Sequence, residues 1–284
     1  MSATQMPGKP LAERIRAGVA EEVAALGGLG LTTVLVGDDP ASEIYIGLKH
    51  RAATEAGMRA DDVRLPAETS EEELLAKIAA LNADDEVDAV LVQLPLPGGL
   101  DEARVVAAID PEKDVDGITP VNAGLLYLGR PALVPATPLG IMALLAEHEI
   151  RLDGARAVVV GRSDIVGKPI AHLLLQANAT VTLCHSHTGD LSRHTLDADV
   201  LVVAAGRAGL VDPGMVKTGS AVVDVGMNRT EAGLVGDVDP GAAEVAGFIT
   251  PVPGGVGPMT IALLLANAVR CARYRRGTAH FPSR

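Results

Sequence analysis

The residues best suited to acid–base chemistry lie in the first half of the chain. Tyr45 and Lys49 are four positions apart in a helical pattern, so both side chains project from one helix face. Lysine is scarcer than arginine here, and a desolvated lysine, unlike an arginine, can release and regain a proton. Lys49 is therefore a candidate proton shuttle, although an ordinary surface lysine beside a half-buried tyrosine would give the same pattern.

Three more polar residues lie near the end of the next predicted strand or after it. Gln93 lies near the carboxyl end of the apolar run 88–94, and open α/β sheets bind ligands beyond such strand ends. A buried amide needs partners, so Gln93 holds either backbone groups or a ligand or side chain. Asp114 and Asp116 sit in a turn, where they could cap backbone donors or where one could anchor a ligand amine.

Residues 250–260, TPVPGGVGPMT, form a loop with few side chains. Three prolines and three glycines cannot sustain a helix or a central strand. The loop joins the apolar run 245–249 to the helix-like run 261–269. Such a rigid loop brings backbone close to something flat or bulky, although a plain interdomain turn has the same composition.

A nucleotide site is indicated after the valine-rich strand that ends at Val160. The strand runs into a turn from Gly161 to Gly167 and then into an apolar helix at 170–175. A strand, a glycine turn and a helix N-terminus present backbone donors to phosphate. The spacing is G-x-S-x-x-x-G rather than G-x-G-x-x-G, so a simple strand-to-helix turn remains an alternative.

The second strand of this region favours NADP over NAD. An NAD site places an acid at the end of that strand, but residues 184–188 read CHSHT. Arg162, Ser186 and either His185 or His187 could instead bind a 2′-phosphate. We expect no metal there, because Cys184 and its neighbour point to opposite strand faces and no second ligand pair has zinc spacing.

Composition predicts an α/β protein of the cytoplasm. The chain has 284 residues, 48% of them hydrophobic but only 2% aromatic, so aliphatic side chains must fill a core that suits parallel sheets. A net charge of −12 disfavours nucleic acid and membrane partners. We see no signal peptide or membrane span, and the two cysteines have no disulfide spacing.

The order of elements predicts two α/β domains, each a mainly parallel sheet flanked by helices, with a substrate cleft between them. We expect residues 1–137, completed by a C-terminal helix at 259–284, to form one domain, and 138–258 to form a Rossmann-like domain. Ser70 and Glu73 predict a capping box, and Thr137 with Pro138 predicts another helix start. The expected strands are 31–36, 88–94, 155–160, 180–184, 199–204 and 220–225, with helices at 42–56 and 139–148.

Seven short motifs occur in an order that is far more specific than any one of them. They are SEIYIGLK at 42–49, VQLPLP at 92–97, KDVDG at 113–117, VGRS-x-IVG at 160–167, DVGMN at 224–228, GDVD at 236–239 and TPVPGGVGPMT at 250–260. Together they closely resemble the bifunctional methylenetetrahydrofolate dehydrogenase/methenyltetrahydrofolate cyclohydrolase family, the bacterial FolD type. The resemblance covers roughly residues 8–275.

The resemblance implies a role for each candidate residue. Tyr45 would stack on the folate rings, Lys49 would be the catalytic base or proton shuttle, Gln93 would tune Lys49, and Asp116 would bind the pterin amine and ring nitrogen. The remaining implied contacts are Gly161, Arg162, Ser163, Ser186 and Met227 to the cofactor, and Pro253, Gly254 and Gly255 as the wall of the folate cleft. Ala136 stands where the family often has cysteine, which should leave the chemistry intact.

The implied enzyme is a homodimer that oxidises 5,10-methylenetetrahydrofolate with NADP and hydrolyses the product to 10-formyltetrahydrofolate. Two other classes remain open at this point: a different nicotinamide-dependent dehydrogenase, of the shikimate or amino-acid type, and a non-catalytic two-domain binding protein. Neither would require Tyr45, Lys49 and Gln93 together with the glycine-proline loop.

Overall fold

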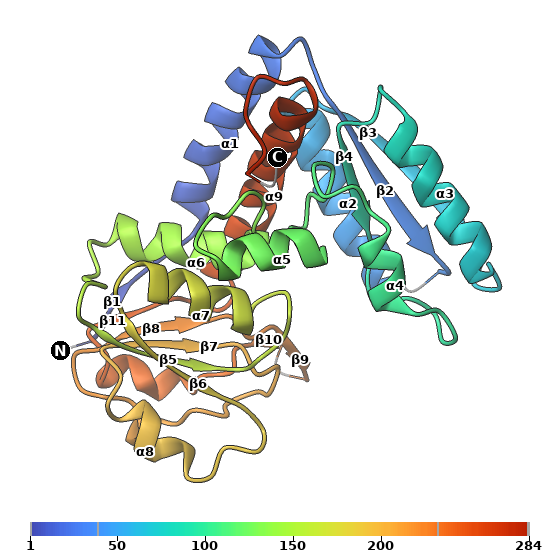
Figure 1. Cartoon of the computed structure of the whole chain (residues 1–284). Helices are drawn as coiled ribbons and strands as arrows, with labels where there is room; N and C mark the ends of the chain where they lie inside the picture. The colour runs from blue at the N-terminus through green and yellow to red at the C-terminus, as the bar shows by residue number, and fades with distance from the viewer. Residues whose placement is uncertain (1, 39, 232, 283–284) are drawn as a thin grey trace. The chain divides into compact units, whose positions relative to one another are not determined.

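The computed structural model describes all residues except 1, 39, 232, 283 and 284, and the side chains of residues 40–45 also lie outside it. The chain divides into two compact units (Figure 1). Residues 14–134 and 264–284 form one, here called the three-stranded unit, and residues 1–13 and 135–263 form the six-stranded unit. The expected domain bounds stay a prediction, and these units differ from them in grouping the first residues with the larger sheet.

The three-stranded unit is built on a parallel sheet with the order β3-β2-β4. The central strand, β2 (Gly30–Val36), is buried at every position, as its apolar sequence requires. It pairs with β3 (Arg59–Leu65) on one side and β4 (Ala89–Val92) on the other. The helices that begin or lie wholly in this unit are α2 (Pro40–Glu55), α3 (Glu71–Ala83), α4 (Glu102–Ala107) and α5 (Pro120–Tyr127).

The predicted capping box at the start of α3 is confirmed. The Ser70 hydroxyl accepts the backbone N–H of Glu73, and the Glu73 carboxylate accepts the backbone N–H of Ser70 at 2.9 Å. Because two helix-end groups are paired reciprocally, α3 starts at a fixed residue. Its buried residues Leu74, Ile78 and Leu81 then face the same core as β2 and β4.

The six-stranded unit holds a wholly parallel sheet with the order β1-β11-β8-β7-β5-β6. Its strands are β1 (Thr4–Gln5), β5 (Arg156–Val160), β6 (Thr180–Cys184), β7 (Val200–Val203), β8 (Ala221–Asp224) and β11 (Phe248–Ile249). The chain leaves β5 toward β6 and then crosses back to β7, so the carboxyl end of β5 is a topological switch point. Ligands of open α/β sheets bind at such points.

The other elements of the six-stranded unit surround this sheet (Figure 1). They are α6 (Ala136–Glu147), α7 (Gly167–Gln176), α8 (Leu191–Thr195), the hairpin β9 (Asn228–Thr230) with β10 (Gly233–Val235), and two 3₁₀ turns at Pro213–Met215 and Pro240–Glu244. Helices α1 (Lys9–Ala25) and α9 (Val256–Arg275) each begin in this unit and continue into the three-stranded one.

The prediction that Thr137 caps α6 is wrong. The helix starts one residue earlier, and Pro135 occupies the cap position without a side-chain hydrogen bond. Thr137 already lies within the first turn, where its hydroxyl is 2.9 Å from that of Thr260. β3 was not predicted, because its sequence RADDVRL is largely charged and exposed; it pairs only with β2 and forms an edge.

Candidate active site

Lys49 and Gln93 meet in the three-stranded unit. Lys49 lies on α2, and Gln93 directly follows β4, with its backbone N–H donating to the Val34 carbonyl at 2.9 Å. Lys49 Nζ donates to Gln93 Oε1 at 3.3 Å, and Gln93 Nε2 donates to the Leu94 carbonyl at 2.7 Å. Both side chains are half-buried. The second bond fixes the amide, so its oxygen is presented to the lysine amine.

Asp116 belongs to the same group. The segment that carries it runs beside β4 as a parallel bridge between Val90 and Asp114, which brings Asp116 level with the carboxyl end of the strand. The side chain is half-buried. Burial raises the pKa of the Asp116 carboxyl, the Lys49 cation opposes this shift, and the Asp114 carboxylate adds to it. The structure thus brings Lys49, Gln93 and Asp116 together.

Asp114, the alternative ligand anchor, is instead committed to the fold. It is fully buried, and its Oδ2 accepts the Thr119 backbone N–H at 2.7 Å and the Asn122 side-chain amide at 2.9 Å. Gly117 has φ +66°, and a Cβ there would lie 2.7 Å from the Val134 nitrogen, so the turn after Asp116 requires glycine. Asp114 therefore stabilises the turn that carries Asp116. Tyr45 lies one turn before Lys49 on α2, but its side chain is outside the described residues.

In the six-stranded unit, the turn after β5 is built from backbone. Gly161 has φ +122°, and a Cβ there would lie 2.1 Å from the Ala204 carbonyl oxygen. A Cβ at Gly167 would lie 2.0 Å from the Gly161 carbonyl oxygen. Ser163 Oγ accepts the backbone N–H groups of Val166 and Gly167, at 3.2 and 3.4 Å, at the start of α7. This glycine cradle at the switch point suits the phosphates of a dinucleotide.

The residues predicted to bind the 2′-phosphate lie on neighbouring segments. Arg162 and Ser186 are both exposed, and they follow β5 and β6, which pair along their whole length. His185 Nδ1 accepts the His187 backbone N–H at 3.1 Å, so one ring nitrogen is already used. Among the described residues, no group of three or more histidine, cysteine or acidic side chains could hold a metal ion.

Two buried carboxylates for which we predicted no role, Asp224 and Asp237, organise the loops after β7 and β8. Asp224 Oδ1 accepts the N–H groups of Gly226 and Asp237, both at 2.9 Å, and Oδ2 accepts that of Val238 at 3.0 Å. Burial raises the pKa of Asp224 to about 6, against the lowering effect of these bonds. Met227, predicted to touch the cofactor, follows Gly226 directly and is 47% exposed.

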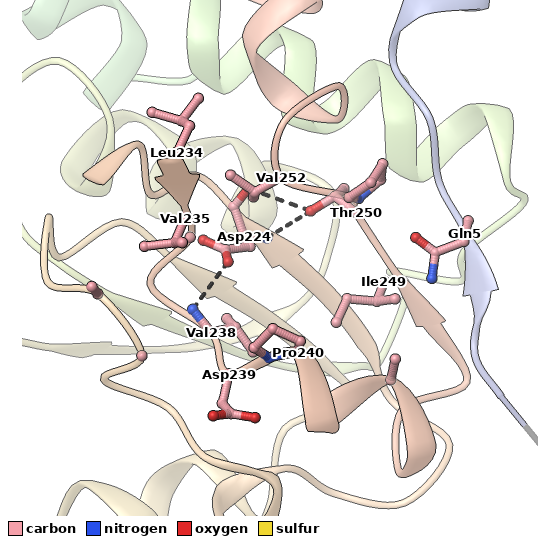
Figure 2. A pocket seen from close by; sticks show the side chains of 15 residues that line it. Gln5, Asp224, Leu234, Val235, Val238, Asp239, Pro240, Ile249, Thr250 and Val252 are labelled. Atoms are coloured by element: carbon pink, nitrogen blue, oxygen red, sulfur yellow. Dashed lines mark hydrogen bonds between the residues drawn. The ribbon is translucent and has the colours of Figure 1, made fainter. Parts of the chain in front are cut away.

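Figure 2 shows Asp224 among the residues that line a pocket, whose volume is about 490 Å³. The Thr250 hydroxyl accepts the Asp224 backbone N–H at 2.8 Å, which ties the start of the 250–260 loop to the end of β8. Val252 also lines the pocket. None of the predicted cofactor residues lines this pocket.

The glycine-proline loop is held against the start of the chain. The Gly8 N–H donates to the Gly254 carbonyl at 2.9 Å, and a Cβ on Gly8 would lie 1.9 Å from the Gly255 carbonyl oxygen. Gly254 has φ +105°, which only glycine adopts readily. The backbone of residues 253–255, including Pro253, therefore has a fixed path with few side chains.

Family models of two domains match this sequence. That of the tetrahydrofolate dehydrogenase/cyclohydrolase catalytic domain matches residues 6–116, and that of the NAD(P)-binding domain of the same enzymes matches residues 135–276. The chain belongs to the tetrahydrofolate dehydrogenase/cyclohydrolase family. The motif-based prediction of the family is confirmed.

Similar proteins support this assignment over nearly the full length of this chain and of each relative. A relative described as bifunctional protein FolD 2 of Frankia alni is 54% identical, with 96% of this chain and 97% of the relative covered. The crystal structure of bifunctional FolD from Campylobacter jejuni superposes with a TM-score of 0.94 at 46% identity, covering 96% of this chain and all of the other. A FolD structure from Trypanosoma brucei, described as complexed with NADP cofactor and inhibitor, gives 0.92 at 39%, covering 98% and 99%.

The family assignment settles the class of protein. The tetrahydrofolate dehydrogenase/cyclohydrolase is an enzyme of one-carbon metabolism, so the non-catalytic alternative and the other dehydrogenase types are excluded. Lys49, Gln93 and Asp116 fall within the catalytic-domain match, whereas Gly161 and Met227 fall within the NAD(P)-binding match. No helix among the described residues is long and apolar enough to cross a membrane.

Proposed function

We propose that the three-stranded unit binds the folate and performs the proton transfers, while the six-stranded unit binds NADP. The enzyme then oxidises 5,10-methylenetetrahydrofolate and hydrolyses the resulting methenyl compound to 10-formyltetrahydrofolate. The observation that carries the proposal is the 3.3 Å bond between Lys49 Nζ and Gln93 Oε1, with Asp116 beside it at the end of β4. The NADP-complexed relative from Trypanosoma brucei supports the choice of cofactor.

Lys49 is the base of the hydrolytic step. As the free amine it takes a proton from a water molecule while the water oxygen bonds to the methenyl carbon. The same proton then returns to the folate nitrogen N5 as its bond to that carbon breaks. The hydroxyl that the water left on the carbon loses its own proton to solvent and becomes the carbonyl, which leaves the formyl group on N10. Gln93 Oε1 accepts a hydrogen from the amine and so directs the nitrogen lone pair away from itself, toward the substrate.

Asp116 and Tyr45 bind the pterin in this proposal. The ionised Asp116 carboxylate accepts hydrogens from the pterin amine and ring nitrogen, and the Tyr45 ring stacks on the heterocycle. Because burial raises the pKa of Asp116, its carboxylate is a strong acceptor that an arriving donor readily satisfies. Pro253, Gly254 and Gly255 belong to the six-stranded unit, and their backbone offers a surface with few side chains that suits a flat ring.

The glycine cradle fits NADP, because a Cβ at Gly161 or Gly167 would clash with neighbouring backbone, so only glycine lets the turn take this path beside a phosphate. Gly161 and Ser163 would hold the phosphates and ribose, Arg162 and Ser186 the 2′-phosphate, and Met227 the adjoining part of the cofactor. NADP supplies the hydride acceptor. The protein contributes orientation of the two bound molecules, which is the main requirement of hydride transfer.

Paired assays of the purified enzyme test this division. We expect reduced cofactor to accumulate with methylenetetrahydrofolate and NADP, and methenyl absorbance to decay in the hydrolytic assay. Lys49→Arg should abolish hydrolysis, because a guanidinium cannot cycle its proton. Lys77→Arg, on α3, is the matched control. Near-normal hydrolysis by Lys49→Arg would remove Lys49 from the mechanism.

The cofactor preference has its own test. We expect a higher kcat/KM with NADP than with NAD, and Arg162→Ala should remove most of the difference because the exposed guanidinium pairs with the 2′-phosphate. Comparable efficiency with both cofactors in the wild type, unchanged in Arg162→Ala, would contradict the assignment.

We further propose that the enzyme is a homodimer of the cytoplasm. The dimer rests on the family resemblance. A reducing compartment agrees with Cys184 and Cys271, which are both buried and free. Analytical ultracentrifugation at assay concentrations would give twice the chain mass, and a monomer that remains fully active would contradict the dimer.

A further inference from the structure

The carboxylate of Asp237 is the most heavily bonded buried group of the NAD(P)-binding unit. It is fully buried, and although it lies in the GDVD motif, neither the motif comparison nor the mechanism above gives it a role. Its Oδ2 accepts the N–H groups of Ala205 at 2.7 Å and Gly206 at 2.8 Å. Its Oδ1 accepts the N–H of Arg207 at 2.8 Å and the side-chain amide of Asn228 at 2.9 Å. Three successive backbone amides thus converge on one anion, the geometry of an anion-binding nest.

Asp237 is in turn held by Asp224 at the end of β8. The Asp237 backbone N–H donates to Asp224 Oδ1 at 2.9 Å. A Cβ at Gly236 would lie 1.8 Å from Asp224 Oδ2, and one at Gly226 would lie 2.4 Å from Asp237 Oδ1. The glycines of the DVGMN and GDVD motifs are therefore explained by the two carboxylates packed against them. Asp237 cannot shift without moving the end of the sheet.

The loop that Asp237 holds is the wall of the glycine cradle. The Ala204 N–H donates to the Val160 carbonyl at 2.7 Å, and the Ala204 carbonyl oxygen closes on Gly161 so tightly that no Cβ fits. Asn228, whose side-chain amide donates to Asp237 Oδ1, is the residue after Met227. One buried carboxylate is therefore bonded both to the loop that packs against Gly161 and to the residue after Met227.

We propose that Asp237 is a positioning residue for cofactor binding, acting through the backbone of residues 204–207 and through Asn228. The inference rests on the proposed use of NADP by this unit. Charge-assisted bonds to a buried carboxylate are stronger than neutral ones, so the loop is fixed before the cofactor arrives. The ordering entropy of the loop is then not lost on binding. Lys49, Gln93 and Asp116 belong to the three-stranded unit, and none of the four bonds to Asp237 described above involves them.

The test is Asp237→Asn, an isosteric change that turns an amide N–H₂ toward the backbone donors. We expect the KM for NADP in the dehydrogenase assay to rise about tenfold or more, the loss expected for one bond to a buried charge. The cyclohydrolase assay, run on methenyl substrate without NADP, should stay within about twofold of wild type. Asp239→Asn is the matched control, because Asp239 is exposed and its side chain caps only the Gly241 N–H.

A purely structural role would lower both activities together, in proportion to the folded fraction, and that result would overturn the proposal. A folded Asp237→Asn enzyme with an unchanged KM for NADP would do the same. If the variant does not fold, Gly206→Ala decides: it keeps the carboxylate and meets no neighbouring atom, but it strains a residue at φ +64°. Its KM for NADP should rise, with hydrolysis spared, and an unchanged KM would overturn the proposal. Absence of NADP-dependent activity in the wild type would instead refute the proposed function.

Discussion

The two units position their functional groups by opposite means. In the three-stranded unit, side chains on two elements meet directly, as Lys49 Nζ and Gln93 Oε1 do at 3.3 Å. In the six-stranded unit, the cradle at Gly161 is backbone, and the buried carboxylates of Asp224 and Asp237 hold the loops around it. Proton transfer needs a titratable group, whereas phosphate binding needs amides without obstruction. A substitution in one unit should therefore impair a different activity from a substitution in the other.

The largest separation of the two activities is expected from Gly161→Ala. Its Cβ would lie 2.1 Å from the Ala204 carbonyl oxygen, so the turn must move by about 1 Å, which can cost about 100-fold in rate. Dehydrogenase kcat/KM should fall by that factor while hydrolysis without NADP is spared. Gly154→Ala is the control, because it also has a positive φ, +75°, but meets no neighbouring atom. Equal losses in both assays would contradict the proposed difference between the units.

Gln93→Leu should have the opposite selectivity and a smaller effect. It removes the acceptor of the Lys49 amine and the donor to Leu94, and an unpaired group of this kind costs about 1–3 kcal/mol. We expect cyclohydrolase kcat to fall roughly tenfold and the KM for NADP to stay constant. A raised KM for NADP with normal hydrolysis would show that Gln93 serves the dehydrogenase reaction instead, and would contradict this prediction.

Asp116 should make folate binding pH-dependent. Because the pKa of its carboxyl is raised, the group takes up a proton at a higher pH than an ordinary aspartate as the solution is acidified. The KM for the folate substrate should therefore begin to rise at that higher pH. In Asp116→Asn it should be high and nearly independent of pH. KM profiles of the two proteins measure this, and coincident profiles would exclude the carboxylate from binding.

The titration of Asp224 should change the stability of the wild-type protein with pH. The two activities near neutral pH should stay intact. Its pKa is about 6 in the fold against 3.8 for an ordinary aspartate. The protonated form is therefore favoured in the folded state, and stability is lost as pH rises between these values, by about 3 kcal/mol in total. Carboxyl ¹³C NMR should show a titration midpoint near 6, and a midpoint below 4 would contradict this environment.

Sequence reasoning identified what depends on side-chain type. The capping box at Ser70 and Glu73 has a local signature and is confirmed. Lys49 and Gln93 are distant in sequence, but each carried a chemical signal of its own, a lysine at helical spacing from a tyrosine and an amide at an apolar strand end. The structure places these two within hydrogen-bonding distance.

What sequence reasoning missed depends on packing. β3 is charged and exposed, so it has no apolar run, and its pairing with β2 is known only from the fold. Asp224 and Asp237 lay inside recognised motifs but had no assigned role, because their partners are backbone amides up to 32 residues away in the chain. An acid within two residues of a glycine in both DVGMN and GDVD was the available signal. Thr137 is a favourable cap residue, but Pro135 occupies the cap position of α6, because helix boundaries follow tertiary packing as well as local preference.

The central claim is that a free amine at position 49 moves the proton during hydrolysis. Chemical rescue of Lys49→Ala measures this most directly, with cyclohydrolase kcat followed as small primary alkylamines are added. We predict that the variant is inactive alone and that alkylamines restore turnover, while guanidinium of the same size does not. Near-normal turnover by Lys49→Ala, or equal rescue by guanidinium, would contradict the account.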